Sequence, residues 1–447
     1  MELELERVKE LLYEKKFISL KEELKNVQSA DVAEIIDELK AKDAIIVFRL
    51  LPKEVAADVF SRISTERQME ISMMVNEKEL TEILDELYFD DKIDFLEEMP
   101  ANVVKRILRN TSEAERKLIN QFLNYPENSA GSLMTIEFID LKKEMSVGEA
   151  LDKIRRIGMD KETIYTCYAI DAERKLEGIV SLKDLVLSPA DKKIKDIMET
   201  DFIYVDTYDD QEEVADIFKK YDLLSIPVVD QENRLVGIIT IDDIVDVIEE
   251  ENTEDFQRMA AMNPSNEEYL SASVLSLARK RITWLLFLMI SATFTGYIIR
   301  YFEDALQSAV ALVSFIPMLM DTGGNAGSQS STLVIRGIAL GEIEFRDILK
   351  IIWKEFRISI LVGIVLALIN FLRIYYFEGY SILISLVVSV TLVFVVIIAK
   401  FIGGTLPIAA KKIGLDPAIM ASPMITTIVD AISLSIYFTL AVWILGI

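Results

Sequence analysis

The chain has 447 residues, with 48 Lys+Arg, 73 Asp+Glu, no His and one Cys, and a formal net charge of −25. Such an acidic chain does not offer the positive surface that nucleic-acid binding requires. The lack of His excludes His-dependent catalytic triads, and with a single Cys it argues against tetrahedral zinc and copper sites. The plentiful carboxylates suit Mg²⁺, Ca²⁺ or Mn²⁺.

The charge divides the chain into two parts. Residues 1–270 carry a net charge of −28, and residues 271–447 carry a net charge of +3. Long apolar stretches occur in the second part, so we predict an acidic soluble region followed by a membrane region. A concentration of acidic groups of this size attracts cations.

The residues up to about Asn124 contain short segments that resemble one another. They include ADVAEIIDELK, LPKEVAADVFSRI, KELTEILDELYF and MPANVVKRIL, and each has apolar residues at helical spacing. Pro52 and Pro100 stand near two of the starts, where proline is tolerated. The pattern predicts a stack of helical hairpins that forms a small superhelix.

An internal repeat follows these helices. LEGIVSLKDLV (Leu176–Val186) matches LVGIITIDDIV (Leu235–Val245), and LMTIEFI (Leu133–Ile139) matches IMETDFI (Ile197–Ile203). Each copy is predicted to end in a strand, a glycine turn, a second strand and a helix. The pattern resembles a tandem pair of CBS domains, which normally pack into one disk.

The segment from Ile244 to Asn263 has a helical pattern without internal Gly or Pro, and it ends before Pro264. It joins the soluble region to the membrane region. We expect a helix that transmits force, with a passive linker as the alternative.

Five stretches are apolar and long enough to cross a membrane as helices, which takes about 20 residues. They are Ile282–Ile299, Ala305 to about Ala326, Ile358 to about Phe377, Ser381 to about Pro407, and Pro417–Ile447. Basic residues gather before the first stretch, between the second and third, and near the connection from the fourth to the fifth. By the positive-inside rule, this distribution predicts a cytoplasmic N-terminal region and an external C-terminus.

Asp430 is the only charged residue between Pro417 and Ile447. A carboxylate at mid-span costs about 2.5–3.5 kcal/mol on insertion scales, so it usually faces a partner, a cavity or an ion. A protonated or paired structural Asp is the alternative. Thr426 lies one turn earlier on the same face, and Pro423 is expected to free a backbone carbonyl. These oxygens suit a hard cation, and Mg²⁺ would keep its water there.

The second stretch ends in the polar segment DTGGNAGSQSSTLVIRG. Asn325, Ser328 or Gln329, and Thr332 fall on one helical face, which would line a water-filled path. The small residues can alternatively serve only close helix packing. Asp321, near the end of the stretch, is expected to be interfacial.

The motifs PMLMDTGGNAGSQSSTLVIRG, GLDPA, SPMITTIVD and YPENSAGSLMT resemble the MgtE family of magnesium channels, also called transporters. The resemblance extends over the whole chain and implies a multidomain protein. The implied parts are an all-α superhelical N domain (residues 1–125), an α/β tandem CBS pair (126–248), a connecting plug helix (249–270) and an all-α pore domain with five transmembrane helices (271–447).

The resemblance also implies a homodimer whose pore follows the dimer axis, with Asp430 in the pore. It implies that acids of the plug helix face Asp416 across the cytoplasmic mouth, where ions would bridge Glu254, Asp255 and Asp416. The other acids that it implies as a cytoplasmic Mg²⁺ sensor are Asp90, Asp94, Asp210, Glu212, Asp222, Asp243, Asp246 and Glu251. Bound Mg²⁺ would close the pore, and repulsion between the acids would open it when Mg²⁺ is low. Any single acid can alternatively belong to a solvated surface.

The predicted function is a Mg²⁺-selective channel of the cell membrane that is gated by cytoplasmic Mg²⁺. The alternatives are a proton- or sodium-coupled divalent-cation carrier and a non-conducting sensor or scaffold. Mg²⁺ is the expected ligand, and ATP is a candidate ligand because CBS domains often bind nucleotides. Phosphate-cradling and metal-hydrolase motifs do not occur, so we do not predict an enzyme. Ser422 stands where the family often has an Asn before proline, which puts an amide role there in doubt.

Overall fold

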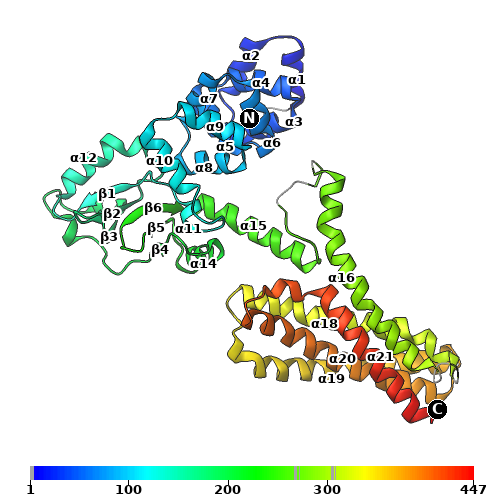
Figure 1. Ribbon diagram of the computed structural model, residues 1–447. Helices are drawn as coiled ribbons and strands as arrows, with labels where there is room; N and C mark the ends of the chain where they lie inside the picture. Colours follow the sequence, from blue (N-terminus) through cyan, green and yellow to red (C-terminus); the bar gives the residue numbers. More distant parts are fainter. Residues whose placement is uncertain (1–4, 266–268, 271, 304–306, 308, 447) are drawn as a thin grey trace. The chain divides into compact units, whose positions relative to one another are not determined.

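The computed structural model describes all residues except 1–4, 266–268, 271, 304–306, 308 and 447. The chain divides into two units, Met1–Ile248 and Glu249–Ile447. Figure 1 shows the helices and strands of both units.

The first unit begins with a series of short helices. They are α1 (Leu5–Tyr13), α2 (Phe17–Leu24), α3 (Ser29–Glu38), α4 (Ala41–Leu50), α5 (Lys53–Arg62), α6 (Thr65–Met74), α7 (Glu77–Leu84), α8 (Phe89–Glu98), α9 (Ala101–Asn110) and α10 (Glu113–Phe122). Alternate helices pack together, α3 with α5, α5 with α7, α7 with α9, α4 with α6 and α6 with α8. This stacking accounts for the similar segments in the sequence.

The helices from α3 to α10 share a regular start. Their N-cap residues recur every 12 residues, at Gln28, Lys40, Pro52, Ser64, Asn76, Tyr88, Pro100 and Ser112. An apolar residue precedes most of these caps, as Leu39, Leu51 and Ile63 do. An apolar residue at this position fixes the angle at which the chain enters the next helix.

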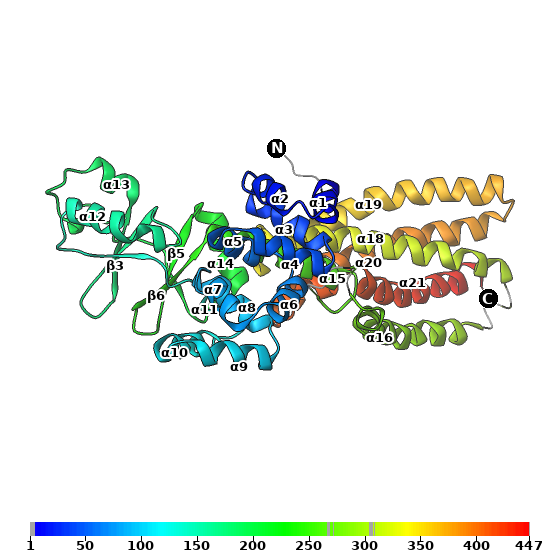
Figure 2. The same ribbon diagram turned by 90° about the horizontal axis from the view of Figure 1, so that it is seen from above.

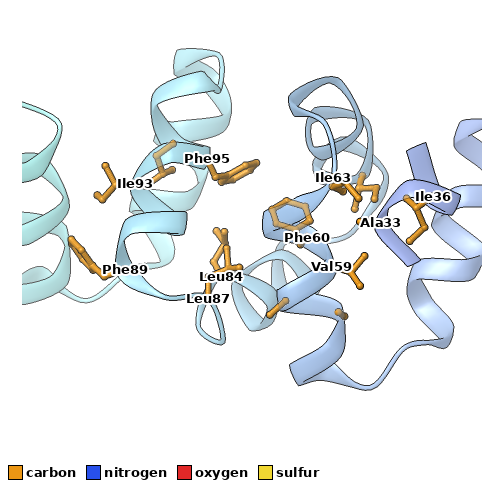
Figure 3. Close-up of a cluster of buried hydrophobic side chains, with 14 of the residues drawn as sticks. Ala33, Ile36, Val59, Phe60, Ile63, Leu84, Leu87, Phe89, Ile93 and Phe95 are labelled. Carbon is orange, nitrogen blue, oxygen red and sulfur yellow. The ribbon is translucent and has the colours of Figure 1, made fainter. Parts of the chain in front are cut away.

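Buried aliphatic and aromatic side chains fill the middle of this helical stack (Figure 3). Phe60 and Phe95 are buried, and their ring centroids lie 5.1 Å apart in an edge-to-face arrangement. Phe89 and Phe122 form a second such pair, at 4.8 Å. These contacts hold α8 in place, and α8 carries acids of the site described below.

The rest of the first unit contains two small sheets. Its elements are α11 (Ala130–Leu133), β1 (Ile139–Lys142), α12 (Val147–Ile157), β2 (Thr166–Ile170), β3 (Leu176–Ser181), α13 (Leu182–Leu187), β4 (Val205–Asp206), α14 (Gln211–Tyr221), β5 (Ser225–Val229) and β6 (Leu235–Thr240). The sheets have the orders β1-β2-β3 and β4-β5-β6, with the first pair parallel and the second antiparallel in each. The two copies of the sequence repeat thus have the same strand order.

The repeated glycine lies inside a strand, and the expectation of a glycine turn is wrong. The turn after β2 places Arg174 at a φ of 66°, whereas Gly178 lies in β3. A Cβ on Gly178 would lie 2.8 Å from the carbonyl oxygen of Glu199, and one on Gly237 would lie 2.8 Å from that of Thr135. Each glycine therefore admits the backbone of the other repeat, which hydrogen-bonds to the strand there.

The second unit is helical. Helix α15 (Ile241–Met259) begins in the first unit and continues into the second. The long helices that follow are α16 (Val274–Tyr301), α18 (Ile316–Ala339), α19 (Ile348–Leu372), α20 (Ile382–Lys412) and α21 (Ser422–Leu445). Within the described residues, four helical stretches are long and apolar enough to cross a membrane: Val274–Tyr301, Phe345–Phe377, Ile382–Lys412 and Ser422–Leu445. Helix α18 packs against α20 and α21, α19 against α20, and α16 against α21 (Figure 2).

The second predicted span has different bounds in the structure. Helix α18 begins at Ile316 and continues to Ala339. The GGN segment (residues 323–325) therefore lies within the helix and not at the end of a span. Residues 305, 306 and 308 of the expected stretch lie outside the described residues. The helix has 24 residues and is about 36 Å long. Its three central glycines face neighbouring helices, where a Cβ would clash.

Candidate functional site

The first unit contains a cavity of about 500 Å³ with an acidic lining. The acids that line it are Glu34, Asp37, Asp58, Asp90, Asp91, Glu162, Asp242, Asp243 and Asp246, and Arg62 and Tyr88 also border it. Three of the predicted sensor residues, Asp90, Asp243 and Asp246, therefore border one cavity. They come from helix α8 and from the start of α15.

Glu137 connects the start of α8 to the CBS-like part of the unit. Its carboxylate accepts the backbone N–H of Phe89 at 3.0 Å, and its carbonyl accepts the N–H of Glu162 at 2.9 Å. One carboxylate oxygen from each of Asp90, Glu137 and Glu162 lies within 4.8 Å of the others. The hydrogen bonds of Glu137 thus place the three carboxylates together.

Carboxylate oxygens are hard ligands, the kind that Mg²⁺ and Ca²⁺ prefer. Around an octahedral Mg²⁺ with Mg–O distances of about 2.1 Å, neighbouring ligands are about 3.0 Å apart and opposite ligands about 4.2 Å apart. The three oxygens would therefore have to move closer together to contact one ion directly, whereas an ion that keeps its water fits a wider separation. The site suits a divalent cation, because a monovalent one would leave more of the negative charge unbalanced.

Burial and mutual repulsion raise the pKa values of this cluster. Burial, with the charges of Asp242 and Asp243, raises the pKa of Glu162 to about 8. Burial and Asp242 raise the pKa of Asp243 to about 7, and burial and Asp243 raise the pKa of Asp90 well above its usual range. Without a divalent cation, the cavity therefore holds protons near neutral pH, and a bound cation would displace them.

These pKa values predict how stability depends on pH. In divalent-free buffer, the folded acids keep protons that the unfolded chain has already released, so stability falls as the pH rises from about 5 to about 8.5. Glu162→Gln removes a group with a pKa of about 8, so it should flatten this dependence. The measurement is the thermal midpoint of the full-length protein at several pH values, with and without Mg²⁺.

The matched control is Glu66→Gln, which removes an exposed acid of α6. Mg²⁺ should raise the wild-type midpoint more at the upper end of the pH range than at the lower end. An unchanged pH slope in Glu162→Gln would contradict the assignment of this cluster.

The remaining predicted sensor residues lie elsewhere. Asp94 is exposed on α8, one turn after Asp90. Asp210 is the N-cap of α14 and accepts the N–H of Glu212 at 2.9 Å, and Asp222 is the left-handed C-cap of the same helix. Within the described lining of the acidic cavity, Asp94, Asp210, Glu212 and Asp222 do not occur.

Sequence reasoning missed several acids that the structure brings to this site. They are Glu34, Asp37, Asp58, Asp91, Glu137, Glu162 and Asp242. The sequence could have indicated Glu137, because the repeat places another acid, Asp201, at the equivalent position of the second copy. Glu162 stands in an irregular segment and had no signal, because only the folded chain brings it beside α8.

In the second unit, Asp416 lies beside the acids at the end of α15. Asp416 caps the short 3₁₀ helix Pro417–Met420 by accepting the N–H of Ala418 at 2.7 Å. Its other oxygen pairs with Arg258, which also pairs with Glu254. Burial, together with the charges of Asp416 and Glu251, raises the pKa of Asp255 to about 6. The three predicted gate-bridge acids are thus close together, and Arg258, which sequence reasoning missed, links two of them.

The polar face of α18 leads to the start of α21. The hydroxyl of Ser328 donates to the Gly324 carbonyl at 2.8 Å and lies 2.9 Å from the hydroxyl of Ser422. Asn325 and Thr332 are exposed in the single chain. Asp430 is half-buried on α21, and Asp321 is near enough to interact with it electrostatically. Two carboxylates and several neutral oxygens therefore lie along α18 and α21.

Pro423 does not free a helical carbonyl, contrary to the expectation from sequence. It stands in the first turn of α21, where its missing N–H costs no helical hydrogen bond. Its own carbonyl accepts the hydroxyls of Thr426 and Thr427, at 3.0 and 2.9 Å. The methyl group of Thr426 faces Gly324 closely, so this residue also packs α21 against α18.

Protein-family models match three regions of the chain. A model described as a divalent cation transporter, MgtE, matches residues 316–440. The MgtE intracellular N domain matches residues 27–128, and the CBS domain matches residues 130–190 and 194–250.

Relatives match almost the entire chain. The magnesium transporter MgtE of Thermus thermophilus is 36% identical over 440 residues, which cover 97% of each chain. The magnesium transporter MgtE of Bacillus subtilis is 34% identical over 430 residues, which cover 94% of this chain and 95% of the relative.

Two solved structures resemble the first unit. The cytosolic domain of the Mg²⁺ channel MgtE in complex with ATP is 38% identical, with a TM-score of 0.52, and covers 55% of this chain and 100% of its own. The soluble part of a magnesium transporter is 30% identical, also with a TM-score of 0.52, and covers 55% of this chain and 97% of its own.

Proposed function

Because the chain belongs to the MgtE family of divalent cation transporters, we propose that it is a Mg²⁺ channel of the cell membrane that cytoplasmic Mg²⁺ closes. Mg²⁺ transport rests on relatives named as magnesium transporters that match the chain over nearly its whole length. The observation that carries the gating is the convergence of Asp90, Glu137 and Glu162 within 4.8 Å.

The proposed path runs along α18 and α21. Asp430 provides the charge that attracts the cation, and Asn325, Ser328, Thr332 and Thr426 provide neutral oxygens. Mg²⁺ sheds its water reluctantly, so it passes as a hydrated ion that these groups contact through water. Helix α18 is the fifth membrane-spanning helix in this proposal, because its length is sufficient and its polar residues face the path.

The path is completed by a second copy of the chain. Asn325 and Thr332 are exposed in one chain, although polar residues of a membrane span normally face a protein interior or water. A homodimer with its axis along this face would enclose them. We further propose that the N-terminal region lies in the cytoplasm and that the C-terminus lies outside the cell.

The proposed gate converts cation binding into closure. At low Mg²⁺ some acids of the cavity are protonated and those that remain charged repel one another, and two like charges 4 Å apart cost about 4 kcal/mol at an effective dielectric constant of 20. A divalent cation between them reverses the sign of this interaction. The signal reaches the mouth through α15, which is one continuous helix from Ile241 to Met259. ATP is a candidate ligand of the CBS pair, since a solved relative carries it.

A single-channel recording tests the function. We expect purified protein in a lipid bilayer to show openings that carry Mg²⁺ and that disappear as Mg²⁺ is raised on the cytoplasmic face. Openings that persist at high Mg²⁺ would contradict the gate but not the pore. Steady uptake into liposomes without channel openings would favour a proton- or sodium-coupled carrier.

A further inference from the structure

Three polar side chains meet inside the membrane unit, away from Asp430 and Asp416. Ser330 of α18, Glu355 of α19 and Lys400 of α20 are only 1%, 7% and 5% exposed. The Ser330 hydroxyl donates to Glu355 Oε2 at 2.7 Å, and Lys400 Nζ donates to the Ser330 hydroxyl at 3.2 Å. Lys400 Nζ lies 3.9 Å from the same carboxylate oxygen. We call these residues the α18–α20 network.

The network places two full charges within membrane-spanning helices. Lys400 lies about 18 Å from the end of α20 at Lys412, well inside the helix. A buried charge within such a helix is expensive, and it is normally found where it has a partner and a function. The proposed permeation path does not use either charge, so their presence needs another explanation.

The helices approach one another very closely at the network. Gly327 is one turn from Ser330, and Gly403 is one turn from Lys400. A Cβ on Gly403 would lie 2.1 Å from the carbonyl oxygen of Gly327, and one on Gly404 would lie 3.2 Å from Cγ of Glu355. Glycine contacts allow close approach but do not fix how far one helix slides along another. The directional hydrogen bonds of the network fix this register.

Neighbouring residues of α18 connect the network to the path. The hydroxyl of Ser331 donates to the carbonyl of Met420, in the 3₁₀ helix that Asp416 caps, at 2.9 Å. Ser328 contacts Ser422 at the start of α21. A shift or rotation of α18 would therefore move the polar face of the path and the element that carries Asp416.

We propose that Glu355 and Lys400 are positioning residues for Mg²⁺ permeation, which hold α18 through Ser330 so that its polar face and the mouth keep their geometry. This inference rests on the proposed function. A purely structural role would change only folding and stability, whereas this proposal ties the network to ion selection. Loss of one charge should also leave the other uncompensated in the membrane.

The test compares ion selection among folded variants of the full-length protein. Lys400→Met and Glu355→Gln should change the permeability ratio of Mg²⁺ to Na⁺ by at least about tenfold, as loss of a supporting residue does at metal sites. Lys400→Arg, which keeps the charge and the donors, should retain the ratio within about twofold. Ratios are measured in bilayers from protein that elutes as a single folded species.

A milder variant covers the case in which the charge variants do not fold. Ser330→Ala removes only the bridging hydroxyl and should shift the ratio in the same direction. Its control is Ser389→Ala. Ser389 of α20 is buried as Ser330 is, but its hydroxyl has no hydrogen-bond partner within the described residues. Wild-type ratios in folded Ser330→Ala and in either folded charge variant would overturn the inference. A wild-type protein that does not conduct Mg²⁺ would instead overturn the proposed function.

Discussion

Asp430→Asn should reduce Mg²⁺ current at a given voltage by about 10- to 100-fold, a range typical for loss of a group that supports a bound metal. Asp430 is the only charge in α21, and the amide has the same shape but does not attract a divalent cation. Because hydrated Mg²⁺ needs this attraction to enter a low-dielectric path, selectivity over Na⁺ should fall together with current. Bilayer recordings with mixed ions measure both quantities.

Two further variants separate charge from shape at this position. Asp430→Glu keeps the charge and should retain a substantial part of the current. Glu344→Gln removes an equally charged acid that is exposed outside α18 and α21, and it should leave the current unchanged. Wild-type current and selectivity in Asp430→Asn would show that the path runs elsewhere.

The family and the sequence repeats could be predicted from the sequence because local patterns determine them. The motifs around Asp430 and in the GGN segment carry the resemblance to MgtE, and this prediction is confirmed by family models and by relatives that match nearly the whole chain. The helical N-terminal region also follows from periodicity, since each short helix has its own apolar face.

What the sequence did not predict depends on contacts between distant residues. Gly178 resembles a turn residue locally, but its role is to admit the backbone of Glu199. The bounds of α18 differ from prediction because polar residues that face other helices do not end a helix. Glu162 and Arg258 join their sites only through partners far along the chain, namely Asp90 and Asp416.

The largest expected change in gating comes from neutralising the mouth. Glu254→Gln, Asp255→Asn and Asp416→Asn together should leave the channel open at cytoplasmic Mg²⁺ concentrations that close the wild type. Asp255 has a pKa of about 6, which burial and the charges of Asp416 and Glu251 raise, so its charge is unfavourable there without a cation. The amides remove both this repulsion and the ligands that a bridging ion needs. Open probability as a function of cytoplasmic Mg²⁺ measures the effect.

The control carries the same number of charge changes, all in the other unit of the chain. Glu66→Gln, Glu113→Gln and Glu213→Gln together remove three exposed acids of the first unit, and closure should remain normal. Normal closure in the mouth variant would place the bridging ions at other residues.

Arg258 distinguishes an ion-only gate from one that the protein partly closes by itself. Its guanidinium links Glu254 to Asp416, so it acts as a fixed cation where a divalent ion would bridge the same acids. Arg258→Gln removes this link but keeps all three carboxylates. Closure should therefore still occur, but at a Mg²⁺ concentration about two- to fivefold higher, which corresponds to about 0.4–1 kcal/mol, the range typical of partly exposed ion pairs. A lower closing concentration would contradict this expectation. It would mean that Arg258 mainly competes with Mg²⁺ for Asp416, because loss of the competing cation would strengthen Mg²⁺ binding at the mouth.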